Sequence, residues 1–170
     1  MTDMLKNCQL CPRACGADRT KSRGACGAGI EIEATRASLH MWEEPPISGT
    51  NGSGTVFFSH CSLGCVFCQN RKISRREAEG QNITADALAK TFLSLEKKGA
   101  HNINLVTGAH YVPQIIEALQ IARKQGLSLP VVYNSSGYEQ VETLQLLDGH
   151  IDIYLPDYKY YSSYYAGLYS

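Results

Sequence analysis

The chain has 170 residues, of which 44% are hydrophobic and 19% are charged, and this composition suits one ordinary globular domain. Its 16 basic and 16 acidic side chains give a formal net charge of zero, so electrostatics provide no reason to expect nucleic acid or an anionic membrane as a partner. No apolar run approaches the roughly 20 residues that cross a bilayer, and residues 1–6 lack the plan of a signal peptide, so we expect a reducing cytoplasm.

Four cysteines lie close together near the N-terminus: Cys8, Cys11, Cys15 and Cys26. Three more follow further along, and seven thiols cannot all pair within one chain. Because thiols stay reduced in the cytoplasm, clustered cysteines indicate metal or redox sites. We therefore predict that residues 1–42 form a Cys-rich metal-binding region. Four thiolates match the ligand count of either a zinc ion or a [4Fe–4S] cluster, and the spacing does not separate the two.

After a linker predicted at residues 43–54, which contains Pro, Gly and Ser, the chain alternates short apolar runs with segments of helical periodicity. The β-branched and aromatic runs predict strands at residues 55–59, 103–107, 131–134 and 151–155. The periodic segments predict helices at residues 84–98, 113–125 and 139–147. Thr84 is expected to cap the first of these helices, and Pro113 suits the first turn of the second. Residues 157–170 hold six of the ten tyrosines and predict an amphipathic helix or a packing surface.

The alternation of strands and helices indicates a parallel sheet with right-handed crossovers. The predicted fold class is α/β, with residues 55–170 forming a parallel β/α partial barrel or a doubly wound sheet, and with the Cys-rich knob in front. In these architectures functional residues gather at the C-terminal ends of the strands. The second group of cysteines directly follows the strand at 55–59. These cysteines are therefore expected at the C-terminal ends of the strands, where functional residues gather.

That second group has the spacing Cys-x3-Cys-x2-Cys, formed by Cys61, Cys65 and Cys68. Short spacers let one loop wrap an iron–sulfur cube, and most such cubes take four cysteines. This loop offers three, and no cysteine follows it in the chain. If the N-terminal cysteines are occupied elsewhere, one iron of a [4Fe–4S] cluster is left open for another ligand.

A zinc site is the competing interpretation, with Cys8 and Cys11 joining Cys65 and Cys68 as four thiolates. The 53 residues between these pairs contain a predicted linker and strand, and Cys61 would be left over. The spacing of the loop, its aromatic residue before the last cysteine and its place after a strand all favour the iron–sulfur cluster.

The loop resembles the signature of the radical S-adenosylmethionine (SAM) superfamily, and the chain as a whole resembles its pyruvate formate-lyase activating enzyme-like branch. Residues 8–15 also resemble the Cys-x-Leu-Cys-Pro-Arg-x-Cys opening of that branch. The resemblance implies that SAM binds the open iron and is reductively cleaved to a 5′-deoxyadenosyl radical. It also implies a reducing donor such as flavodoxin or ferredoxin, and a glycyl radical enzyme as protein substrate. Four of the six β/α units that superfamily members build are visible, so the core is expected to be truncated at its C-terminus.

The resemblance further implies SAM contacts in the turns that follow the cluster loop and the later strands. The turn after the second strand corresponds to a Gly-Gly-Glu stretch; here it keeps the glycine and has no acid. His110 in that turn is interpreted as a polar loop histidine rather than as a catalytic residue. The turn after the fourth strand is similar to an Asp-x-Lys motif, whose lysine pairs with the SAM carboxylate. The candidate SAM contacts are Asn70, Thr107, Gly108, Asn134, Ser136, Asp157 and Lys159.

Three hypotheses follow for the function. The first is an enzyme that cleaves SAM and activates a glycyl radical enzyme. The second is an inactive truncated fragment that retains an iron–sulfur cluster. The third is a zinc-stabilised binding module.

Overall fold

The structure is a computed structural model that describes residues 2–170. Its strands are β1 (Ile32–His40), β2 (Ser53–Phe58), β3 (Gln81–Ile83), β4 (Ile103–Val106), β5 (Val131–Ser135) and β6 (Ile153–Pro156). They form one six-stranded sheet in the order β3-β1-β2-β4-β5-β6. The four strands from β2 to β6 in that order run parallel, whereas β1 is antiparallel to both β2 and β3.

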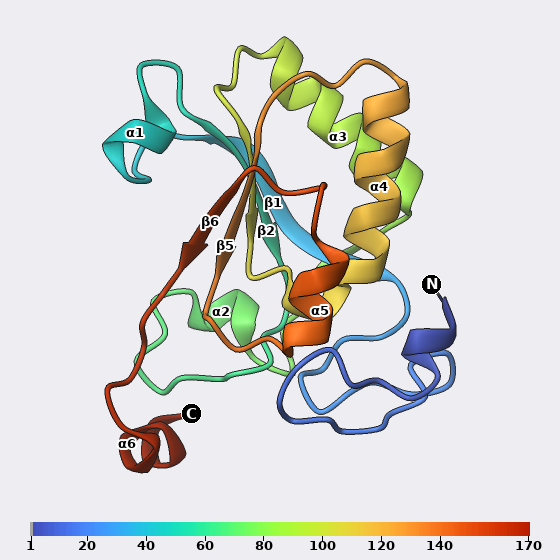
Figure 1. Cartoon of the computed structure of the whole chain (residues 1–170), viewed down its shortest axis with the longest axis vertical. Coiled ribbons are helices and arrows are strands. Elements are labelled where there is room, and N and C mark those ends of the chain that lie inside the picture. The colour runs from blue at the N-terminus through green and yellow to red at the C-terminus, as the bar shows by residue number, and fades with distance from the viewer. Residues whose placement is uncertain (1) are drawn as a thin grey trace.

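Two short 3-10 helices and six α-helices complete the fold. They are η1 (Thr2–Leu5), α1 (Pro45–Ser48), α2 (Arg71–Ser74), α3 (Ala85–Lys97), η2 (Ala109–Tyr111), α4 (Val112–Lys124), α5 (Val141–Leu146) and α6 (Ser163–Tyr169). Figure 1 shows α3, α4 and α5 on one side of the sheet, with the N-terminal knob and α6 near one end of the molecule. Within residues 2–170, no helix combines the length and apolar character needed to span a membrane.

The two faces of the parallel strands have different neighbours. Leu105 and Tyr133, which pair across β4 and β5, are buried in the hydrophobic core beneath the helices. The next paired residues, Val106 and Asn134, line a cavity on the other face. Side chains alternate between the two faces along a strand. In this register one face of the sheet packs against the helices, and the other face lines the cavity.

The predicted α/β fold with a parallel β/α core is confirmed, and each predicted strand and helix is present within a few residues of its expected bounds. The Thr84 hydroxyl accepts from the amide of Ala87 at 3.2 Å and caps α3. Pro113 lies in the first turn of α4. Helix α5 is shorter than predicted, and its first residue, Val141, is 63% exposed.

The strand count was wrong, because the sequence predicts four strands and the sheet has six. Strand β1 lies in the segment assigned to the Cys-rich region, and it pairs along β2 from Ala34 to His40. Its middle residues are exposed, so it lacks the continuous apolar run that marked the parallel strands. Strand β3 has three residues, which is too short for a periodic signal.

The segment predicted as a linker is ordered and begins against the sheet. The Ser48 hydroxyl donates to the carbonyl of Glu43 at 3.1 Å and accepts from its amide at 2.9 Å. The Asn102 side chain donates to the carbonyl of Ile47 at 2.7 Å. These contacts fix α1 and the backbone of Glu43, whose side chain lines a cavity beside the sheet.

Candidate functional site

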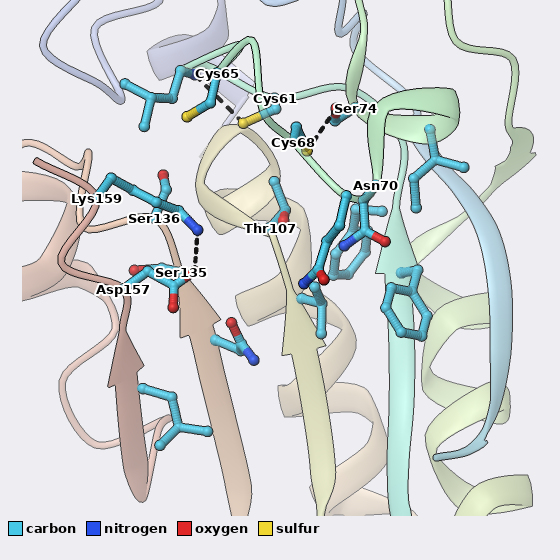
Figure 2. A pocket seen from close by; sticks show the side chains of 18 of the residues that line it. Cys61, Cys65, Cys68, Asn70, Ser74, Thr107, Ser135, Ser136, Asp157 and Lys159 are labelled. Atoms are coloured by element: carbon cyan, nitrogen blue, oxygen red, sulfur yellow. Dashed lines mark hydrogen bonds and ion pairs between the residues drawn. The ribbon is translucent and has the colours of Figure 1, made fainter. Parts of the chain in front are cut away.

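A cavity of about 1240 Å³ opens beside the C-terminal ends of the parallel strands (Figure 2). This is the edge where α/β proteins place their functional residues. Four segments reach it from the ends of β2, β4, β5 and β6, which explains how residues nearly 100 positions apart meet there. The predicted residues that line it are Cys61, Cys65, Cys68, Asn70, Thr107, Asn134, Ser136, Asp157 and Lys159.

Gly108 is placed differently from its neighbour Thr107. A side-chain carbon added at Gly108 would lie 2.7 Å from Cδ1 of Ile115, so this glycine turns toward α4 and the core. Thr107 has a φ of 60°, in the left-handed region, and its side chain lines the cavity. Thr107 is therefore the residue of this turn whose side chain faces the cavity.

Each sulfur of the three-cysteine loop accepts a hydrogen bond. Cys61 Sγ accepts from the amide of Leu63 at 3.4 Å. Cys68 Sγ accepts from the hydroxyl of Ser74 on α2 at 3.3 Å, as Figure 2 shows. Cys65 Sγ accepts from the hydroxyl of Ser170, which follows α6, at 3.2 Å. Such donors stabilise thiolates and tune a bound cluster, so the loop has the surroundings that metal-binding sulfurs need.

Two arginines hold the backbone of this loop, and the sequence analysis missed both. Arg13 Nε donates to the carbonyl of Ser62 at 2.6 Å, and its Nη2 donates to Leu63 at 3.2 Å. Arg75 donates to the next two carbonyls, Gly64 at 2.6 Å and Cys65 at 2.9 Å. Four consecutive carbonyls are thus fixed by guanidinium groups, which orients the loop without using any thiol.

A buried network precedes the loop. His60 is fully buried with a φ of 71°, and its Nε2 lies 3.1 Å from a carboxylate oxygen of Glu33 on β1. Arg23 donates to the other oxygen of that carboxylate at 2.7 Å. Glu33 therefore ties the knob, the first strand and the start of the loop together. Neither β1 nor this carboxylate carries a local sequence signal, which explains why the network was missed.

Lys159 and Asp157 form an ion pair where the chain leaves β6 (Figure 2). Both side chains line the cavity, and the Lys159 side chain is 31% exposed. An ammonium in this position can bind a carboxylate group of a ligand, since it is already held beside the cavity by its neighbour.

Glu43 is a cavity residue that the sequence analysis did not select. Its Oε2 accepts from the side-chain amides of Asn104 at 2.7 Å and Asn134 at 3.1 Å. Burial, followed by the neighbouring Glu44, raises the pKa of the Glu43 carboxyl above its ordinary value. Asn104 lies on β4 and Asn134 on β5, so this carboxyl is held against the cavity face of the parallel strands.

The structure places His110 differently from the polar loop position that its sequence context indicates. His110 is buried in η2, with its Nε2 2.8 Å from the carbonyl of Ser59, and burial lowers its pKa to about 3. It is a packed core histidine and not a loop residue.

The tyrosine-rich tail forms α6 and rests on the cysteine loop through the amide of Val66, which donates to the carbonyl of Tyr169 at 2.9 Å. The tail therefore contacts the cysteine loop, while Tyr158, Tyr161 and Tyr164 remain exposed.

The four N-terminal cysteines lie in one folded knob. Cys8 is paired with the segment just after Cys15, because its amide donates to Ala17 and its carbonyl accepts from Gly16. A side-chain carbon added at Gly24 would lie 3.8 Å from Cys15 Sγ and 3.5 Å from Cys26 Sγ, so these two sulfurs lie on the same side of Gly24. In the part of the chain that the structure describes, no three Cys, His, Asp or Glu side chains converge closely enough to hold a single metal ion.

The sequence from the first parallel strand to α6 identifies the protein's family. Residues 55–164 match the model of the radical SAM superfamily. The chain belongs to this superfamily. Radical SAM proteins use a [4Fe–4S] cluster together with SAM, and the donor set of the cavity fits both groups, because three thiols on one loop face a space lined by polar side chains of both charges.

The radical SAM chain also has a curated relative. An uncharacterized protein of Methanocaldococcus jannaschii is 31% identical over 163 residues, which cover 93% of this chain and 47% of that protein. The chain thus spans about half the length of the curated relative it matches. No solved structure is detectably similar to the chain.

Proposed function

We propose that this radical SAM protein binds a [4Fe–4S] cluster through Cys61, Cys65 and Cys68 and uses it to cleave SAM reductively. The observation that carries the proposal is that all three sulfurs line one cavity and each accepts a hydrogen bond. Three thiolates leave one iron of a cube without a protein ligand, and the cavity has room for a cofactor of SAM's size beside it. When bound and reduced, the cluster supplies the electron that cleaves SAM to methionine and a 5′-deoxyadenosyl radical.

The residues of the chain bind and shield SAM in this proposal. Lys159 pairs with the SAM carboxylate, while Asn70, Thr107 and Ser136 offer hydrogen bonds along the cavity wall. Apolar side chains on the inner face of the sheet, Phe57 and Val106 among them, limit the access of water to the reacting bond. Glu43 also lines the cavity, and in this proposal its carboxyl faces the molecule that gives up a hydrogen atom.

Anaerobic reconstitution tests the proposal. The full chain is loaded with iron and sulfide, reduced with dithionite and given SAM, and 5′-deoxyadenosine and methionine are measured. Both products are expected, and Cys65→Ala should abolish them, whereas Lys21→Ala on the knob surface should not. A cluster that forms and leaves SAM intact would support the inactive fragment instead. Purified protein that holds zinc at the loop cysteines and takes up no cluster would support the zinc-stabilised module.

The finer proposal is that the hydrogen donor is a glycine of a partner protein and that flavodoxin or ferredoxin delivers the electron. It is supported by the resemblance of the N-terminal motif at residues 8–15 to the activating-enzyme branch. A glycyl radical enzyme deuterated at glycine should transfer deuterium into 5′-deoxyadenosine. SAM cleavage without any deuterium transfer would leave the cleavage proposal intact and reject this substrate class.

A further inference from the structure

We propose that Cys8, Cys11, Cys15 and Cys26 bind a second metal centre of thiolate ligands, either zinc or a [4Fe–4S] cluster, and that a buried arginine neutralises its charge. The proposal concerns the knob alone and does not depend on SAM cleavage.

The knob carries its four cysteines on three neighbouring turns, and a bound metal would draw their thiols closer together than they lie in the structure. The turn after Cys11 is closed by the amide of Ala14, which donates to the Cys11 carbonyl at 2.9 Å. The turn before Cys26 is closed by the amide of Gly27, which donates to the carbonyl of Gly24 at 2.9 Å. Cys8 pairs with the segment that leaves Cys15. Loop-rich segments of this size seldom have a core that holds them folded, and metal binding supplies that stability.

The apolar core of the knob is indeed small. Its buried cluster consists of Leu5, Cys8 and Leu10, with Ile30 packed against it. One of these three buried residues is itself a candidate ligand. Hydrophobic burial therefore gives this region little stability, and a bound metal explains how it keeps a defined fold.

Arg19 provides the independent observation that points to a negatively charged ligand set. Its side chain is 2% exposed, and it lies over the ring of Tyr111, with 5.5 Å from the guanidinium carbon to the ring centroid. The guanidinium donates to two neutral carbonyls, Gly29 at 2.9 Å and His110 at 2.5 Å. Its Nη1 lies 4.0 Å from Cys8 Sγ. Among residues 2–170, no carboxylate forms an ion pair with it.

A buried guanidinium without a counterion is costly, and arginine does not lose its proton. Four thiolates around a divalent ion carry a net charge of about −2, so a metal at the knob would place the missing counter-charge beside Arg19. A four-thiolate iron–sulfur cluster would serve in the same way. Once a metal is bound, the negative charge of the thiolates would therefore balance the positive charge of the Arg19 guanidinium.

The test uses the anaerobically purified full chain and two sets of variants. In the first, Cys61, Cys65 and Cys68 are all changed to Ala, which removes the loop ligands. Metal analysis of this variant should still find about one zinc, or about four irons with matching sulfide, per chain. In the second, Cys11→Ser is combined with Cys26→Ser, and the same amount of metal should be lost while the iron of the loop cluster remains.

X-ray absorption separates the two metals, because zinc with four thiolates gives Zn–S distances of about 2.3 Å. A folded loop variant that carries no stoichiometric metal would overturn the proposal, and so would disulfides among the knob cysteines. Metal content unchanged in the double knob variant would do the same. Since the loop variant leaves every knob residue in place, its result stands even if the knob variant does not fold.

Discussion

Arg13 donates to the carbonyl of Ser62 at 2.6 Å, which joins the middle of the Cys11–Cys15 turn to the middle of the Cys61–Cys65 turn. The two cysteine groups are therefore one connected structure. We expect Arg13→Ala to weaken the cysteine loop by about 1–3 kcal/mol, because two charged hydrogen bonds are lost. Iron and sulfide uptake, followed by absorbance of the cluster, should show a lower yield at equal protein concentration. Lys21→Ala is the control, since Lys21 pairs with nearby Asp18 on the knob surface; equal yields from both variants would contradict the prediction.

Lys159→Met should weaken SAM binding about tenfold, because it removes a charge-assisted hydrogen bond to the ligand carboxylate. The measurement is the dependence of 5′-deoxyadenosine formation on SAM concentration, and KM should rise more than kcat falls. Lys90→Met on the exposed side of α3 is the matched control. A variant with an unchanged KM would remove Lys159 from the SAM site.

Glu33→Ala should lower the free energy of unfolding by about 3 kcal/mol, because it leaves buried His60 and the inner side of Arg23 without their shared carboxylate. The loss lies at the low end of the range for buried pairs, because the Arg23 side chain is 52% exposed and solvent screens its charge. Denaturant unfolding under anaerobic conditions measures it. Glu31→Ala, two residues earlier and exposed, should change stability by less than about 0.5 kcal/mol.

Glu43→Gln should change how stability depends on pH. Burial raises the pKa of the folded Glu43 above 4.5, so the protonated form is favoured by folding. Its contribution to stability is present below the unfolded pKa and is lost as pH rises through the folded pKa. A glutamine keeps an acceptor for Asn104 and Asn134 and carries no charge, so the variant should gain stability relative to the wild type as pH rises from about 4 to about 7.

Thermal unfolding of both proteins across that pH range gives the comparison. Glu117→Gln, on an exposed part of α4, serves as the control and should follow the wild type. Parallel curves for Glu43→Gln and the wild type would show that the folded carboxyl titrates as it does in the unfolded chain.

The sequence predicted those features that depend on local chemistry. The parallel strands were visible as apolar runs, Thr84 as a helix cap, and the cysteine loop as a cluster signature after a strand. Topology then brought Asn134, Asp157 and Lys159 to the same cavity, because parallel strands share one C-terminal edge. The strands, the helix cap and the cysteine loop are short-range patterns in the sequence. The shared cavity follows from the rule that strand–helix–strand units give parallel neighbouring strands.

The missed features depend on partners far away in the chain. Arg13 and Arg75 bind backbone carbonyls of the loop. Every residue has such a carbonyl, so no residue type in the sequence marks these contacts. Glu43 reaches Asn104 and Asn134 across more than 60 positions, from a segment whose composition indicates a linker. Strand β1 was hidden because its central residues face solvent. No local period or spacing could have revealed these contacts.

The seven cysteines fall within the first 68 residues, and Arg13 joins their two groups at one end of the molecule. Helices α3 and α4 and the strands beneath them contain no thiol. Exposure to air would therefore damage one end and spare the other, since thiolates oxidise first. A sample handled aerobically would keep most of its circular dichroism while losing its chemistry, and normal secondary structure is a poor guide to intact protein in this case.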